Sequence, residues 1–247
     1  MCENYTTYCY INMKYLSMKY ALLLICAAVL VPASIKAQQI SVGPAAGFHF
    51  TKYTAKRSGT SVIDLNQKKN VVDWRVGAIT DISLSKRFHL QSGLLFTTNT
   101  FKYDGEPTQP SVYESFFSMQ SLELPVTMTL HTGDKNKGHF FCSGGGFLAC
   151  NIAGKKIIKS SGAIGLFPGQ VATLEEDLKY GSESPADYRR LGTGVLVSAG
   201  YQYKSGFSAR VHYQRGLRNQ FVRPSNDYKM TSSNIGLTLG YLIRVKG

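Results

Sequence analysis

His212 is the residue in this sequence that most suggests catalysis, because Ser208 falls on the same side of a strand-like run. Nucleophilic catalysis needs a serine within hydrogen-bonding reach of the histidine and a carboxylate that orients the ring. Ser208 is four residues away, about 13 Å along a strand, and no acidic residue follows nearby in the sequence. We therefore expect no enzymatic activity.

Metal and cofactor sites are not expected from the sequence either. The five histidines stand singly, without the close His/Cys spacing that is typical of metal sites. The glycine run 144–146 lacks the following Lys-Ser/Thr of a phosphate-binding loop, and glycine inside a strand more often permits close packing. The prediction is no bound metal and no cofactor.

Charged and imidazole side chains do recur on one side of the alternating segments. The candidates for a charge network on that side are Glu123, Arg75, Arg210, Arg218 and His212, with Asp81 and His49 on the same side of their own segments. Two interpretations remain open, a polar track for solute passage and a salt-bridge network that fills the interior. An unpaired buried carboxylate is costly, so Glu123 should contact arginine, which favours the network.

A second group of residues could bind anions. Lys155, Lys156 and Lys159 stand at the start of the longest expected loop, and the residues that should lie on the same side of the molecule are Lys52, Lys56 and Arg57. They could bind lipopolysaccharide phosphates by Coulombic attraction, or they could simply be solvated, and both interpretations stay open. The net charge of +13 does not indicate nucleic-acid binding, because the chain carries an export signal and no nucleic-acid-binding motif.

The export signal lies near the beginning of the sequence. Met18-Lys19-Tyr20 is a short basic start, residues 21–31 are an unbroken apolar run, and Ala37 offers a small residue before Gln38. This order is that of a secretory signal peptide, and the apolar run is too short to span a bilayer. We expect residues 1–37 to be a cleaved signal, with Met18 a plausible true start, and residues 38–247 to form one domain.

Alternation of apolar and small polar residues dominates the rest of the chain. Residues 234–245 show it most clearly, and 191–203, 207–218 and 122–131 behave in the same way. Four weaker runs are 40–51, 72–84, 88–103 and 139–153. Most of these eight segments are longer than ordinary strands and match the 9–11 residues that a transmembrane β-strand needs.

The connections alternate between short turns and long polar loops. The long ones are residues 52–71, 104–116, 154–188 and 218–230. The face opposite the apolar positions is mainly Gly, Ser and Thr, whereas a water-exposed face would carry more Lys and Glu; charged residues make up only 17% of the chain. The pattern predicts an all-β fold, an eight-stranded antiparallel up-and-down transmembrane β-barrel with both ends on the periplasmic side.

Four stretches in this order also resemble the PorT-like outer-membrane β-barrel family of Bacteroidetes. They are SLELP at 121–125, GGGFLACNIAGK at 144–155, YQRGLRN at 213–219 and GLTLGYLI at 236–243. The resemblance implies the fold and an outer-membrane location. It implies little about activity, although one branch of the family serves protein secretion.

Three functions compete at this point. The leading hypothesis is a non-enzymatic outer-membrane barrel whose loops contact outer-membrane lipid, lipopolysaccharide or other envelope proteins. The second is a narrow transport barrel or an accessory subunit of a secretion apparatus. The third, a soluble exported barrel that binds an apolar ligand, is disfavoured by the scarcity of Lys and Glu opposite the apolar positions. The oligomeric state is left open.

Overall fold

The computed structural model describes residues 39–56, 62–64, 71–104, 112–133, 138–161, 171–181, 188–222 and 229–245. The predicted signal peptide lies outside the described residues, so its cleavage stays a prediction. All of the regular secondary structure in the described part of the chain is β-strand, as expected. In this part there is no helix long and apolar enough to cross a membrane.

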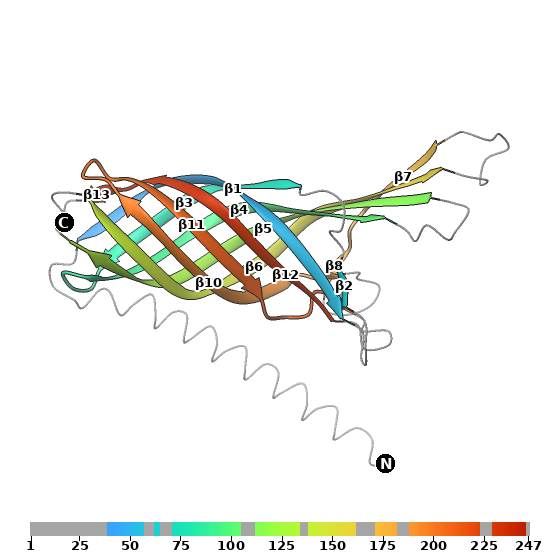
Figure 1. Ribbon diagram of the computed structural model, residues 1–247. Coiled ribbons are helices and arrows are strands. Elements are labelled where there is room, and N and C mark those ends of the chain that lie inside the picture. The colour runs from blue at the N-terminus through green and yellow to red at the C-terminus, as the bar shows by residue number, and fades with distance from the viewer. Residues whose placement is uncertain are drawn as a thin grey trace, which may run out of the picture. The chain divides into compact units, whose positions relative to one another are not determined.

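Eight long antiparallel strands close into a barrel (Figure 1). They are β1 (Ile40–Lys56), β3 (Val72–Ser83), β4 (Phe88–Asp104), β5 (Val112–Thr132), β6 (His139–Ser161), β10 (Leu191–Gln202), β11 (Phe207–Gly216) and β12 (Lys229–Tyr241). Strands that are consecutive in this order pair with each other, and β12 pairs with β1 to close the ring. The predicted eight-stranded up-and-down barrel is confirmed.

The described residues also form five short strands besides those of the barrel. β13 (Ile243–Val245) continues the line of β12 along β1, and β2 (Val62–Asp64) pairs with the far end of β1. β7 (Val171–Asp177) pairs with the last third of β6, and β8 (Tyr180–Gly181) forms a parallel pair with β9 (Tyr188–Arg189). β5, β6 and β7 together project from one end of the barrel as a three-stranded ribbon (Figure 1).

The ribbon corrects two of the predicted loops. β5 already begins at Val112 and β6 runs on to Ser161, although residues 104–116 and 154–188 read as loops in the sequence. The register between β5 and β6 shifts at Gln120/Ser121, because Gln120 pairs with Ala153 and Ser121 with Asn151, which leaves Ile152 of β6 as the extra residue of a β-bulge. The faces change in β6 beyond the bulge, whereas Met119, Ser121 and Glu123 of β5 all stay buried on one face. A pattern search that requires unbroken alternation therefore ends β6 at the bulge.

The barrel is polar inside and apolar outside. Along β3, Trp74 and Val76 are exposed, while Asp73 and Arg75 between them are buried. Large exposed hydrophobic side chains occur on all eight barrel strands, far beyond the single patch that a soluble monomer tolerates. The predicted facing is confirmed, because Val197 and Leu239 point outward and Ser198 points inward.

The two ends of the barrel differ. The short connections that follow β3, β5 and β10 lie at the end where β1 begins and β13 finishes, which we name the short-turn end. Gly133 and Gly206 take positive φ values of 100° and 95° there, as tight turns require. The opposite end carries the ribbon and the long connections, and we name it the long-loop end.

Candidate functional site

A buried ion pair crosses the middle of the lumen. Arg75 of β3 donates from one guanidinium nitrogen to both Glu123 carboxylate oxygens on β5, at 3.1 and 3.3 Å, and to Gln214 Oε1 of β11 at 2.8 Å. The Gln214 amide in turn donates to Glu123 Oε1 at 2.5 Å. All three side chains are almost completely buried. Strands on opposite walls are thereby tied together through one closed triangle of hydrogen bonds.

The other predicted network residues take different places. Arg210 does face the lumen, but it donates to Gln91 and lies over the Phe141 ring, so within the described part of the chain Arg75 is the one arginine that contacts Glu123. His212 is buried beside Thr238, with Nδ1 and Oγ1 3.3 Å apart. Arg218 is a correction, because β11 ends at Gly216 and Arg218 is exposed at the rim, where it donates to a backbone carbonyl.

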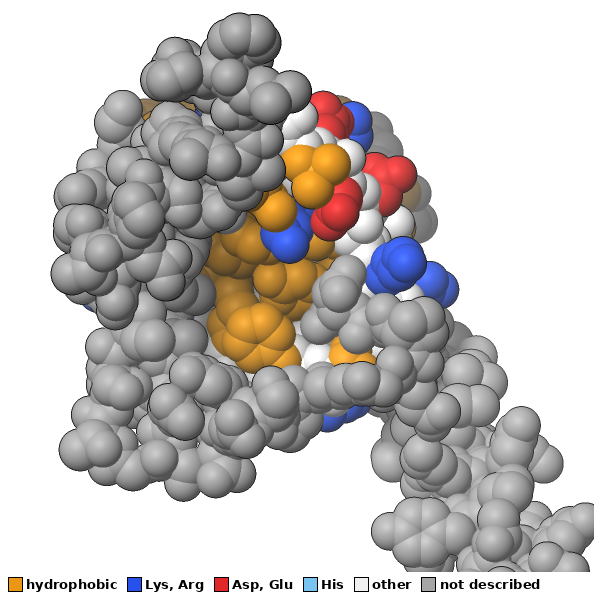
Figure 2. All heavy atoms as spheres, turned by 90° about the vertical axis from the view of Figure 1, so that its right-hand side faces the viewer, with side chains coloured by type: hydrophobic (Ala, Val, Ile, Leu, Met, Phe, Trp, Pro, Cys, Tyr) orange, Lys and Arg blue, Asp and Glu red, His pale blue; other side chains and the backbone are white. Residues whose placement is uncertain are grey.

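An apolar cluster closes the lumen at the long-loop end, and the sequence analysis missed it. We name it the outer cap; its buried members are Tyr53, Phe101, Met119, Leu178, Tyr188 and Met230. Phe101 stacks on Phe117 with ring centroids 4.5 Å apart and contacts Tyr53 at 4.6 Å. Figure 2 looks onto this end and shows hydrophobic side chains filling the opening. The sequence could have indicated this cluster, because Tyr53, Phe101 and Met119 are apolar residues at lumen-facing positions near the long-loop ends of β1, β4 and β5.

The lumen is thus filled at successive levels. Between the Arg75–Glu123 pair and the short-turn end, a small apolar cluster of Ala45, Ile79, Leu95 and Leu242 also faces inward. Two cavities beside the ion pair measure only about 50 and 30 Å³. A barrel of eight strands has an interior that side chains can fill, and this one is filled.

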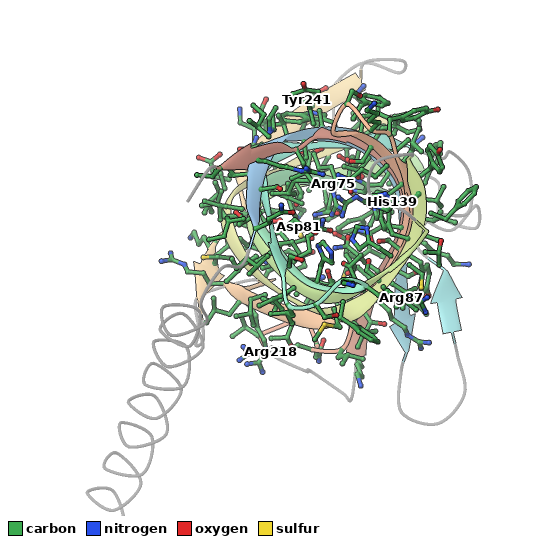
Figure 3. The ribbon with its side chains drawn as sticks, turned by 90° about the vertical axis from the view of Figure 1, so that its left-hand side faces the viewer. Arg75, Asp81, Arg87, His139, Arg218 and Tyr241 are labelled. Carbon is green, nitrogen blue, oxygen red and sulfur yellow. The ribbon has the colours of Figure 1, made fainter. Side chains whose placement is uncertain are left out.

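The short-turn end instead opens into a cavity of about 360 Å³. Asp81, His89, His131 and His139 line it, and Figure 3, viewed from this end, shows Asp81 and His139 inside the ring of strands. The sequence analysis found its histidines scattered and expected no metal site. A signal was nevertheless available, since the three histidines all flank the short turns and have the parity of the lumen face.

The basic residues that the structure describes have different surroundings. Lys155, Lys156 and Lys159 belong to β6 rather than to a loop, which corrects the expected placement. Lys155 is hydrogen-bonded to Glu175 of β7 at 2.5 Å, and this contact raises the pKa of Lys155. Lys156 lies over Phe117 and Lys159 over Phe116.

The remaining members of the predicted anion-binding group are only partly described. Lys52 is exposed on β1. The side chain of Lys56 and the whole of Arg57 lie outside the described residues. Carboxylates at 175–177 pair along β7 with the region of Lys155 and Lys156, so anion binding there is weakened by charge of the opposite sign.

Comparisons with solved structures find outer-membrane barrels at low sequence identity. OprG from Pseudomonas aeruginosa is 11% identical, covers 84% of this chain and 96% of its own, and has a TM-score of 0.40. The attachment invasion locus protein Ail of Yersinia pestis is 12% identical over 82% of this chain and 98% of its own, with a TM-score of 0.31. Neisserial surface protein A is 10% identical over 83% and 99%, with a TM-score of 0.34. No curated protein matches the sequence.

A family model gives the decisive match. It is described as the outer membrane protein beta-barrel domain, and it matches residues 36–222, which is most of the barrel from β1 to the end of β11. The closed eight-stranded ring, its apolar outer surface and its polar interior agree with that description. The chain belongs to the outer membrane protein beta-barrel domain family.

Proposed function

We propose that this outer-membrane protein is a non-enzymatic, sealed barrel that anchors the β5–β6–β7 ribbon outside the cell, where the ribbon contacts envelope components. Outer-membrane barrels place short turns in the periplasm and long loops outside, so the long-loop end faces the exterior. The ribbon then stands above the lipid surface.

The observation that carries this proposal is the filled lumen beneath a strand pair that outgrows the barrel. β5 has 21 residues and β6 has 23, about twice the length that a membrane crossing requires. A chain that used the barrel only as a pore would gain nothing from these extensions. A strand pair fixed at its base by the bilayer is well suited to present a surface.

Transport is the competing interpretation. A conductor needs a continuous polar passage, and the outer cap together with the Arg75–Glu123–Gln214 triangle opposes one. An accessory role in a secretion apparatus, and a PorT-like origin in Bacteroidetes, rest on the four sequence stretches alone. We keep both as proposals that a sealed barrel accommodates, since neither requires conduction through the lumen.

We further propose that the ribbon base binds lipopolysaccharide phosphate. Beside the base of the ribbon, Lys102 of β4 and Lys159 of β6 both lie over the Phe116 ring of β5, with ammonium-to-centroid distances of 5.1 and 5.6 Å. An aromatic ring flanked by cations suits the boundary between acyl chains and phosphates. The ammonium group of Lys155 is held by Glu175 at 2.5 Å and does not contact the Phe116 ring in the same way.

The test compares the wild type with one single variant, Lys155→Gln, and one double variant, Lys102→Gln/Lys159→Gln. The full barrel, refolded in neutral detergent, is heated with and without added lipopolysaccharide, and the folded fraction is read from its heat-modifiable gel mobility. We expect lipopolysaccharide to raise the melting temperature of the wild type and of Lys155→Gln, and to leave Lys102→Gln/Lys159→Gln unchanged. An equal rise in all three proteins would contradict the assignment of the Phe116 site.

A further inference from the structure

Four potential metal ligands converge on the cavity at the short-turn end. Asp81 on β3, His89 on β4 and His131 on β5 each present one ligand atom, and these three atoms lie within 4.8 Å of one another. His139 on β6 stands beside them, with its ring centroid 4.6 Å from that of His131. All four side chains are buried. They come from four successive strands, which explains why no local sequence motif announces them.

The distances are those of a site that small side-chain rotations would complete. Asp81 Oδ1 is 2.5 Å from His89 Nδ1, and Asp81 Oδ2 is 3.9 Å from His131 Nε2. Ligands about 2.0–2.1 Å from a tetrahedral zinc ion are about 3.3 Å apart, which lies between these two values. The Asp81–His89 contact must open and the Asp81–His131 contact must close, each by less than about 1 Å, and any pair of ligand atoms near the 4.8 Å limit must approach by about 1.5 Å. Two buried polar atoms, Asp81 Oδ2 and His89 Nε2, accept or donate no hydrogen bond among the described residues.

We infer that Asp81, His89 and His131 form a binding site for a divalent transition metal ion of the zinc class at the periplasmic mouth of the barrel. Imidazole nitrogen with carboxylate oxygen is a donor set for zinc and its neighbours in the first transition row, whereas calcium and magnesium take oxygen donors. The 360 Å³ cavity gives the ion an entry path and leaves room for water to complete its coordination.

The residues deeper in the lumen would keep a bound ion at this site. Gln91 follows His89 on the same face of β4 and holds the Arg210 guanidinium, and Arg75 lies further in. These fixed positive charges repel a cation that would move deeper, and the apolar cluster of Ala45, Ile79, Leu95 and Leu242 offers it no ligand. A bound ion would therefore cross-link β3, β4 and β5 close to their short connections.

The competing explanation is a network that only stabilises the rim. A proton shared between Asp81 and His89 would satisfy that pair without any ion, and the imidazole rings of His89 and His131, tilted by 35° with centroids 4.1 Å apart, would simply pack. The two explanations differ in one respect. Only the metal site requires Asp81 and His131 to bind the same added metal ion.

The experiment titrates the refolded, tag-free barrel in detergent with zinc ions by calorimetry and with cobalt ions by visible absorption. We expect one ion per chain with micromolar or tighter affinity, and the absorption bands of cobalt in a four-coordinate nitrogen and oxygen site. His131→Asn and Asp81→Asn should each weaken binding at least about tenfold. His212→Asn, which removes a buried lumen imidazole of a different layer, should leave affinity unchanged.

A measurement on the wild type alone protects the test against variants that fail to fold. Diethylpyrocarbonate modifies accessible imidazole nitrogens, and mass spectrometry locates the modified residues. Zinc should protect His89 and His131, whereas His49 and His212, which are buried in the filled lumen, should stay unmodified with or without zinc. Absence of zinc binding at micromolar concentrations, or binding that is equal in the wild type and His131→Asn, would overturn the site.

Discussion

Removing the Glu123 carboxylate is the sharpest test of the filled lumen. Glu123→Ala leaves the Arg75 guanidinium, which is 3% exposed, without its counter-ion. Breaking a buried ion pair by removal of one partner costs about 3–5 kcal/mol. Arg75 keeps its 2.8 Å bond to Gln214, so we expect the lower end, a loss of about 3 kcal/mol in the free energy of unfolding.

Two further variants separate the charge from the shape. Glu123→Gln retains an acceptor for Arg75 but removes the charge, and it should cost about 1.5 kcal/mol. Arg75→Ala/Glu123→Ala removes both partners. Its cost should be smaller than the sum of the two single costs by about 2 kcal/mol, because no buried charge is left alone.

The assay is urea unfolding of the barrel in lipid vesicles, followed by tryptophan fluorescence. Trp74 is the sole tryptophan, points outward from β3 and contacts Phe96, so its emission reports release of the barrel from lipid. Insertion should survive in every variant, because the lipid-facing side chains are unaltered. An unchanged midpoint in Glu123→Ala, or strictly additive costs in the double variant, would refute the reasoning.

Three other outcomes follow from the fold. Leu239 points outward at 43% exposure, so Leu239→Arg should cost about 2–4 kcal/mol if it lies near the midplane, and Leu239→Ala much less, in the same unfolding assay. At Gly145 an added Cβ would lie 2.2 Å from the Val126 carbonyl oxygen, whereas at Gly144 an added Cβ would have no heavy atom of the described structure within 4 Å. Gly145→Ala should therefore lower the unfolding midpoint, and Gly144→Ala should not. Phe101→Ala removes a buried ring of the outer cap and should cost about 3 kcal/mol, and urea titration that finds it silent would contradict the cap.

The sequence predicts the barrel well because the outer face of each strand contacts lipid and the inner face lines a polar lumen. Val72, Trp74 and Val76 alternate with Asp73 and Arg75, and this alternation alone sets strand, register parity and face. It also predicts that Glu123 meets an arginine. Which arginine it meets depends on the three-dimensional arrangement of the strands: Arg75 donates to Glu123, and Arg210 donates to Gln91 instead.

Two features lie beyond what the sequence pattern can predict. The β6 half of the ribbon is concealed by the bulge opposite Gln120, which reverses the alternation of that strand. The ligand cluster is concealed because His89 and His131 are 42 positions apart in the sequence (131 − 89) and meet only after β4 and β5 pair. Local spacing identifies metal sites built on one turn or helix, and it fails when adjacent strands supply one ligand each.

Conductance of the pure wild-type protein tests the central claim most directly. The barrel is reconstituted into planar lipid bilayers and the current is recorded at steady voltage in salt solution. The Arg75–Glu123–Gln214 triangle and the outer cap predict negligible steady current from the wild type. Stable, large and weakly selective channels from the wild type would contradict the sealed lumen and would establish the barrel as a pore.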